Sequence, residues 1–189
     1  MAGSTRLKRE TRLFQRADRY MRCRNRRRLF GILTRHPDLL HMSDGERSLL
    51  MSACWRYEYE IVEWMLKHGA NPDLVGSKGV NTPLIYAAVE NDLRLARLLL
   101  EFGADIEKAN DTFETPLGFA CAYDAIDVVR LLCERGANVN GTEGWGSSYL
   151  YGVQCAKQTE IENILVSYGA KVIHEEPKLK AEGDEEAKL

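Results

Sequence analysis

The 189-residue chain lacks the patterns on which most catalytic and membrane functions depend. No apolar run approaches the ~18 residues of a membrane-spanning helix, and the start has no apolar core like that of a secretory signal. The phosphate-binding patterns G-x-x-x-x-G-K-[ST] and G-x-G-x-x-G and the zinc-protease pattern H-E-x-x-H are absent. The four histidines are scattered along the chain. We therefore expect no catalytic residue, metal site, cofactor, small-molecule substrate or membrane insertion.

Cysteine is scarce and unpaired in the sequence. The five cysteines are odd in number and form no C-x-x-C pair. This usage indicates a reducing compartment without a disulfide framework. It predicts a cytoplasmic protein, with association with the cytoskeleton, the nucleus and the mitochondrion as alternatives. Cys54 and Cys121 follow alanines at packing positions, and Cys133 replaces a leucine, so we expect these three thiols in the core.

Glycine and proline are missing from Thr5 to Phe30, so these 26 residues are compatible with a single helix. Acids are nearly missing there too. Residues 1–36 contain twelve Lys or Arg against Glu10 and Asp18, a charge of +10, and the rest of the chain therefore carries −12 to give the overall −2. Such segregation of charge predicts that the basic segment has a role of its own.

A block ending in Gly-Ala recurs four times, at Gly69, Gly103, Gly136 and Gly169, with spacings of 34, 33 and 33 residues. A leucine stands 19 residues before each of these glycines. A fixed period near 33 is typical of stacked helix pairs, in which each unit buries its apolar face against a neighbour.

Each repeat predicts two helices. Thr82-Pro83 and Thr115-Pro116 are suited to helix starts, where the hydroxyl caps free amides and proline loses no hydrogen bond. The first helix of one unit is therefore expected from about Thr82 to Glu90. Apolar residues at helical spacing before each glycine predict the second helix, which the glycine ends in a left-handed conformation.

The pattern resembles the ankyrin repeat, whose T-P-L-H-x-A and G-A-(D/N) elements are matched by residues 82–87 and by Gly103-Ala104-Asp105. The resemblance covers roughly residues 28–172. It implies an all-α solenoid of helix-turn-helix units joined by β-hairpin fingers. The family's histidine after the leucine is replaced in every unit, by Met51, Ile85, Gly118 and Tyr151.

Three regions are predicted. A basic, Arg-rich helical arm covers residues 1–27. The ankyrin-repeat domain covers 28–173, with a degenerate cap at about 28–47, repeats at about 48–81, 82–114 and 115–147, and a cap repeat at 148–173. An acidic, charged tail of low apolar content follows at 174–189, and we expect it to be disordered or ordered by a partner.

The resemblance also implies a place for a protein partner, on the concave side formed by the first helices and the finger tips. Aromatic residues and arginine dominate binding hot spots, and several occupy these positions. The predicted partner-binding residues are Trp55, Arg56, Lys78, Tyr86, Glu90, Asp111, Phe113, Phe119, Tyr123 and Trp145. Packing of individual rings between repeats is the alternative interpretation.

The arginines of the arm recur at helical spacing, on a face different from that of Leu7, Phe14, Ala17 and Met21. Four interpretations are open: a cap folded back on the acidic repeats, contact with an acidic protein surface or cytoskeletal polymer, phosphate binding on RNA or DNA, and a mitochondrial targeting segment. The predicted contact residues are Arg9, Arg12, Arg16, Arg19, Arg22, Arg26, Arg27 and Arg28.

These observations predict a non-enzymatic adaptor, scaffold or subunit of a complex. Its concave face would bind a protein, and its arm would contact an acidic surface. The alternative is a subunit of a ribonucleoprotein or chromatin complex, in which the arm binds phosphates and the repeats serve as its scaffold.

Overall fold

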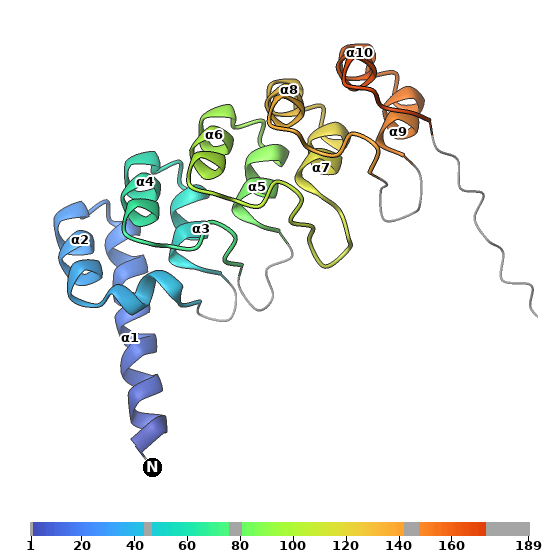
Figure 1. Cartoon of the computed structure of the whole chain (residues 1–189). Helices are drawn as coiled ribbons and strands as arrows, with labels where there is room; N and C mark the ends of the chain where they lie inside the picture. The colour runs from blue at the N-terminus through green and yellow to red at the C-terminus, as the bar shows by residue number, and fades with distance from the viewer. Residues whose placement is uncertain (1, 44–46, 76–80, 142–147, 173–189) are drawn as a thin grey trace, which may run out of the picture.

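The computed structural model describes residues 2–43, 47–75, 81–141 and 148–172, with side chains in the first segment from residue 8 onward. Within these residues the chain forms a row of paired α-helices and one short 3-10 helix (Figure 1). The elements are α1 (Ala2–Arg22), α2 (Arg26–Arg35), η1 (Pro37–His41), α3 (Leu49–Cys54), α4 (Tyr59–Lys67), α5 (Pro83–Val89), α6 (Leu93–Glu101), α7 (Pro116–Ala122), α8 (Ile126–Glu134), α9 (Tyr149–Cys155) and α10 (Thr159–Ser167).

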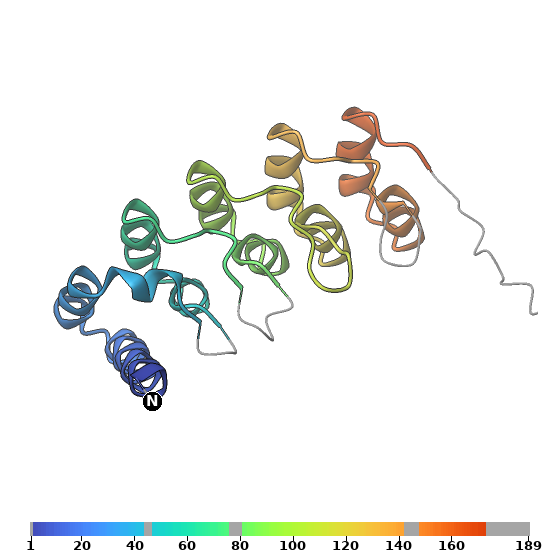
Figure 2. The same ribbon diagram turned by 60° about the horizontal axis from the view of Figure 1, so that its bottom comes forward.

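The helices form two rows along the stack. The first helices, α1, α3, α5, α7 and α9, contact one another in sequence, and α6, α8 and α10 form contacts in the second row. Figure 2 shows the pairs succeeding one another as steps, with α1 beside α2 at one end. One continuous apolar core runs from Phe14 in α1 to Leu165 in α10. Each pair therefore buries its apolar side against its neighbours, as a solenoid requires.

Hydroxyl caps start the first helices of the four repeats, as predicted. The side chains of Ser48, Thr82, Thr115 and Ser148 accept the backbone N–H of the residue three positions later, at 3.1 to 3.3 Å. A cap of this kind satisfies an amide that has no partner within the helix. The predicted helix at Thr82–Glu90 is observed as α5, with Thr82 and Glu90 as its two caps.

The four glycines of the Gly-Ala blocks have φ between +81° and +90°, which confirms the predicted left-handed helix ends. A second left-handed position recurs between the two helices of every pair. It is occupied by Arg24, Tyr57, Asn91, Asp124 and Lys157, with φ between +49° and +58°. After each of them an amide bonds to the carbonyl five residues earlier, from Asn25 to Tyr20 in the first pair.

The prediction of one helix from Thr5 to Phe30 is wrong, because the chain turns at Cys23–Asn25 between α1 and α2. Arg24 takes the left-handed conformation there, with a φ of +51°. The side chain of Asn25 then caps α2 by accepting the N–H of Arg28 at 3.2 Å. The expected division between residues 27 and 28 thus falls inside α2, and α1 and α2 together form the first helix pair.

The second half of α1 is packed into the fold. Phe14, Ala17 and Met21 are at most 1% exposed, and α1 contacts α2, α3 and η1. In Figure 1 the N-terminal half of α1 projects past the stack. Part of the basic segment therefore closes the end of the core.

The expected β-hairpin fingers stay a prediction. The described residues form no strand and contain one isolated antiparallel bridge, between Ser43 and Ser48. The loop before α7 is nevertheless tightly closed. The amide of Asn110 donates to the carbonyl of Glu114 at 3.0 Å, and the side-chain oxygen of Asn110 accepts the amides of Thr112 and Glu114, each at 3.0 Å.

Candidate functional site

Exposed aromatic side chains gather along the row of first helices. Trp55 ends α3 and is 43% exposed, and its ring centroid lies 6.3 Å from that of Tyr86 on α5. On α7, Phe119 and Tyr123 stack with their centroids 6.0 Å apart, and Tyr123 is 58% exposed. These rings lie on three successive repeats. We call Trp55, Tyr57, Tyr86, Phe119 and Tyr123 the aromatic row.

Tyr57 connects two repeats within the aromatic row. Its hydroxyl donates to the Oε2 atom of Glu90 at 3.1 Å and accepts the hydroxyl of Tyr86 at 3.4 Å. Burial and the hydrogen bond to Tyr57 raise the pKa of Tyr86 above its ordinary value. Both phenols therefore remain neutral at physiological pH and keep these hydrogen bonds.

A cation adds to this surface. The guanidinium of Arg47 lies 5.2 Å from the centre of the Trp55 ring, within the range of a cation–π contact. Arg56, which the sequence indicated, is half-buried and donates to the carbonyl of Ser52 at 3.4 Å. Neither Arg47 nor Tyr57 was among the predicted site residues.

The loop before α7 exposes one more ring. Phe113 is 82% exposed, and its φ is +63°. A bulky side chain in this conformation is unusual and strained. The neighbouring Asp111 is exposed as well. The loop thus holds an aromatic side chain in solvent at a conformational cost, as a contact residue for a partner requires.

The predicted residues are only partly brought together. Trp55, Tyr86 and Glu90 form one cluster, with Tyr57 joining the last two. Phe119 and Tyr123 form a second cluster. Lys78 and Trp145, as well as the tail at 174–189, lie outside the described residues.

The arginines of the first helix pair fall into two groups. Arg22 pairs with Asp18 at 2.9 Å, and Arg26 pairs with Glu58 at 2.9 Å and also with Glu60. These contacts join basic residues to acids of the chain itself, and the hydrogen bond to Glu58 raises the pKa of Arg26. Two of the eight predicted acidic-surface residues are therefore already paired within the protein.

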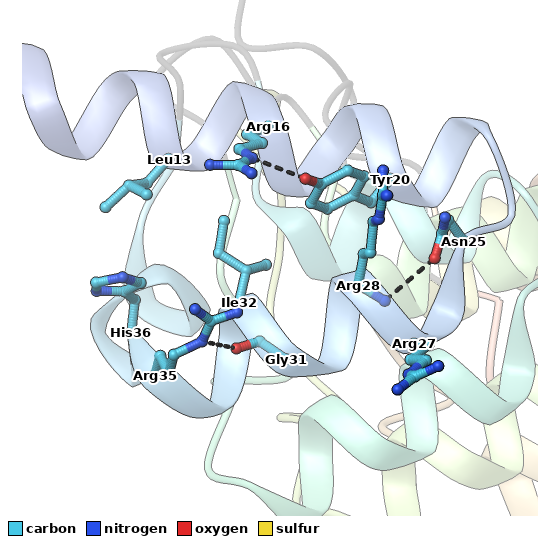
Figure 3. Close-up of a pocket in the computed structure, with 10 residues that line it drawn as sticks. All are labelled: Leu13, Arg16, Tyr20, Asn25, Arg27, Arg28, Gly31, Ile32, Arg35 and His36. Atoms are coloured by element: carbon cyan, nitrogen blue, oxygen red, sulfur yellow. Dashed lines mark hydrogen bonds between the residues drawn. The ribbon is translucent and has the colours of Figure 1, made fainter.

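The second group lines an open groove of about 870 Å³ between α1 and α2 (Figure 3). Arg16, Arg27, Arg28 and Arg35 are exposed at its walls, with Leu13, Tyr20 and Ile32 between them. None of these four arginines pairs with a carboxylate in the described part of the chain. We call this the arginine groove. The sequence pointed to three of its four arginines but not to Arg35 or to the groove itself.

Comparison with protein families accounts for the repeating unit. A model described as ankyrin repeats (3 copies) matches residues 28–111 and 50–143, which together span more than half of the chain. The chain belongs to the ankyrin-repeat family. A search of curated protein sequences finds no match to it. Ankyrin repeats mediate protein–protein interactions, and this ankyrin-repeat protein presents its exposed aromatic rings on the helices that they form.

The structure extends the repeats of this ankyrin-repeat protein beyond the matched residues at both ends. The pair α9–α10 continues the stack, and α1–α2 has the same left-handed turn as the other pairs. A sequence signal for the first pair exists. Moving Leu50 back by 33 residues gives Ala17, and moving Tyr57 back gives Arg24, which have the same burial and turn roles as their counterparts.

Two further searches of the structure concern other kinds of site. Among the residues with a described position, no group of three or more His, Cys, Asp or Glu side chains is arranged to hold a metal ion. No helix in the described segments is long and apolar enough to cross a membrane. Cys54, Cys121 and Cys133 are buried free thiols, as predicted, and burial raises the pKa of Cys133 to about 11.

Proposed function

We propose that this ankyrin-repeat protein is a non-enzymatic adaptor or subunit of a complex that binds a protein partner through the aromatic row. The observation that carries the proposal is the continuity of exposed rings over α3, α5 and α7. Rings of this kind provide a large contact area at a low cost in side-chain entropy, which makes them binding hot spots.

The loop with Phe113 belongs to the same proposal. It precedes α7, which contributes Phe119 and Tyr123, and its ring is the most exposed of the large apolar side chains described. Asp111, Glu90 and Arg56 supply polar contacts around the rings. Lys78 and Trp145 would extend this surface along neighbouring fingers.

The basic helices supply a second contact, with an acidic protein surface or a cytoskeletal polymer. Arg9, Arg12, Arg19, Arg27 and Arg28 are exposed, and none pairs with a carboxylate in the part of the chain that the structure describes. A one-signed group of cations accelerates the approach of an acidic partner and selects against basic ones. Free buried thiols suit a reducing compartment, and we propose the cytoplasm.

Capture of cellular proteins on the immobilised protein, with identification by mass spectrometry, tests this function. The double variant Trp55→Ala with Tyr123→Ala should lose its main partner while its helical circular dichroism is retained. The matched control is Val166→Ala with Tyr168→Ala, which removes two exposed apolar side chains from the end of α10. Equal capture by both variants would contradict binding through the aromatic row.

Nucleic-acid binding through the arm is the competing outcome. It would show as a steep loss of affinity with rising salt, because each neutralised phosphate releases counterions. A contact centred on aromatic rings should weaken little over the same range. Measuring capture at about 50 and 200 mM salt therefore separates the two.

A further inference from the structure

The arginine groove lies where the stack would continue if another repeat preceded α1. In the next helix pair, residues 33 positions after Arg16 and Arg28 are Leu49 and Ile61, which are 1% and 0% exposed. The position of Arg28 is filled by a fully buried apolar residue in each of the other four pairs: Ile61, Leu95, Val128 and Ile161. Arginines thus stand at positions that elsewhere form the contact with a neighbouring pair.

A polar surface is expected at the end of any solenoid, because the terminal unit faces water. The two ends of this stack differ, however. On the C-terminal pair the polar groups are mixed, and the Gln154 amide donates to Glu162 at 2.9 Å. In the arginine groove the charges have one sign, which solvation alone does not require.

The groove is also held in shape. The Nε atom of Arg16 donates to the Tyr20 hydroxyl at 2.8 Å, and the guanidinium groups of Arg16 and Arg28 lie 5.6 and 6.0 Å from the centre of the Tyr20 ring. Arg35 donates to the carbonyl of Gly31 at 2.7 Å. Figure 3 shows these side chains reaching between α1 and α2. Placing the cations in advance lowers the entropic cost of binding an anion.

The floor between the cations is apolar. Leu13 is half-buried, and Ile32 lies beside it in the lining of the groove. A ligand that fills this site must offer carboxylates at its edges and apolar side chains at its centre. An amphipathic acidic helix has this arrangement, and it has the shape of the helix that a preceding repeat would place there.

The geometry points to docking of an acidic, amphipathic helical segment of a partner protein in the arginine groove, where it continues the ankyrin stack by one more helix. This deepens the proposed contact of the arm with an acidic protein and rests on it. Carboxylates of the segment pair with Arg16, Arg27, Arg28 and Arg35, and its apolar side chains pack on Leu13 and Ile32. A nucleic acid fits less well, because it has no apolar face for this floor and because residues 37–189 carry −12.

The probe is a labelled peptide of about 18 residues, or five helical turns, with leucine at the i, i+3, i+4 and i+7 positions and glutamate elsewhere. Its binding to the full chain is measured by fluorescence anisotropy. Peptides with glutamine for glutamate, and with serine for leucine, test the charge and the apolar floor separately. A single-stranded RNA of equal charge is the fourth probe. The Glu–Leu peptide should bind most tightly of the four.

Two groove variants, Arg16→Gln with Arg28→Gln and Arg27→Gln with Arg35→Gln, should each bind the Glu–Leu peptide at least about tenfold more weakly, because charge-assisted hydrogen bonds are lost. The second variant leaves the Tyr20 contacts intact and so guards against a folding defect in the first. The control, Arg97→Gln with Arg135→Gln, removes the same charge at exposed positions on α6 and at the end of α8. It should bind within about twofold of the wild type.

Three results would overturn the proposal. They are equal loss in control and groove variants, tighter binding of RNA than of the peptide through the same arginines, and no peptide binding by the wild-type chain. Suppose that peptide binding is absent while capture of a cellular partner still depends on Arg9, Arg12 and Arg19. The acidic-surface contact then stands, and the groove proposal alone fails.

Discussion

The guanidinium of Arg26 on α2 lies 2.9 Å from the carboxylate of Glu58, which is 7% exposed at the turn before α4. Arg24 approaches the same carboxylate at 3.5 Å, and Arg26 also pairs with Glu60. The contact joins the first helix pair to the second. It shows that part of the positive charge of this end of the chain serves the fold itself.

Replacing Arg26 with alanine should lower the free energy of unfolding by about 1–2 kcal/mol, because the buried carboxylate of Glu58 loses its better partner. Urea denaturation followed by circular dichroism measures the change. Arg27→Ala is the matched control, since its neighbouring side chain is exposed and unpaired in the described residues, and it should change stability by less than about 0.5 kcal/mol. Equal effects of the two substitutions would contradict the brace.

Glycines in two conformations should respond to alanine with opposite signs. Gly31 lies within α2, and an added Cβ would meet the Nη2 atom of Arg35 at an ordinary 3.6 Å, so Gly31→Ala should stabilise the protein by about 0.5–1 kcal/mol. Gly103 has a φ of +81°, so Gly103→Ala should destabilise it by about 1 kcal/mol although nothing fills the space around it. Thermal melts of the two variants, compared with the wild type, test the prediction. A shift in the same direction for both would show that the backbone conformation of Gly103 is not decisive.

Phe113 and Asn110 share a loop but should separate binding from stability. Phe113→Ala should reduce partner capture at least about tenfold while changing the free energy of unfolding by less than about 0.5 kcal/mol, because the ring is 82% exposed. Asn110→Ala should instead cost about 1–3 kcal/mol, because Asn110 is buried and its side chain satisfies two amides of the loop. Capture assays and urea denaturation of both variants provide the comparison. Full capture by the Phe113 variant would remove this loop from the binding surface.

Tyr59 should make part of the stability depend on alkaline pH. Its hydroxyl donates to Asp92 at 2.8 Å, and burial together with Asp92 raises its pKa from 10 to about 12. A raised pKa in the folded state gives a stabilisation that is complete below pH 10 and is lost as the pH rises through about 12. Tyr59→Phe should therefore cost about 1 kcal/mol at pH 8 and less at pH 11. Urea denaturation at both values measures the difference, and a constant difference would contradict the assignment.

The repeats were predictable because their signals are local. A hydroxyl that caps a helix and a glycine that ends one act within a few residues, so the positions of Thr82, Thr115, Gly103 and Gly136 set helix ends that the structure reproduces. The turn at Arg24 could not be read in this way. It has neither glycine nor proline, and its left-handed conformation follows from packing of α1 and α2 on the next pair.

The candidate sites were predictable in kind but not in arrangement. Trp55 and Tyr86 follow from their positions in the repeat, whereas their link to Glu90 depends on Tyr57, which lies in a turn and has no helical periodicity. The arm showed its charge in the sequence. Which arginines are paired and which remain available depends on distances between helices, as the contrast of Arg26 with Arg27 shows.

The recurring turn from Arg24 to Lys157 places all five helix pairs in a single series. The arginine groove and the aromatic row therefore stand at a separation counted in whole repeats, as marks do on a ruler. Two partners bound to this protein would be held at a spacing that its repeat number defines. Insertion or loss of one repeat between the two surfaces would change that spacing by a fixed increment and leave the chemistry of each surface intact.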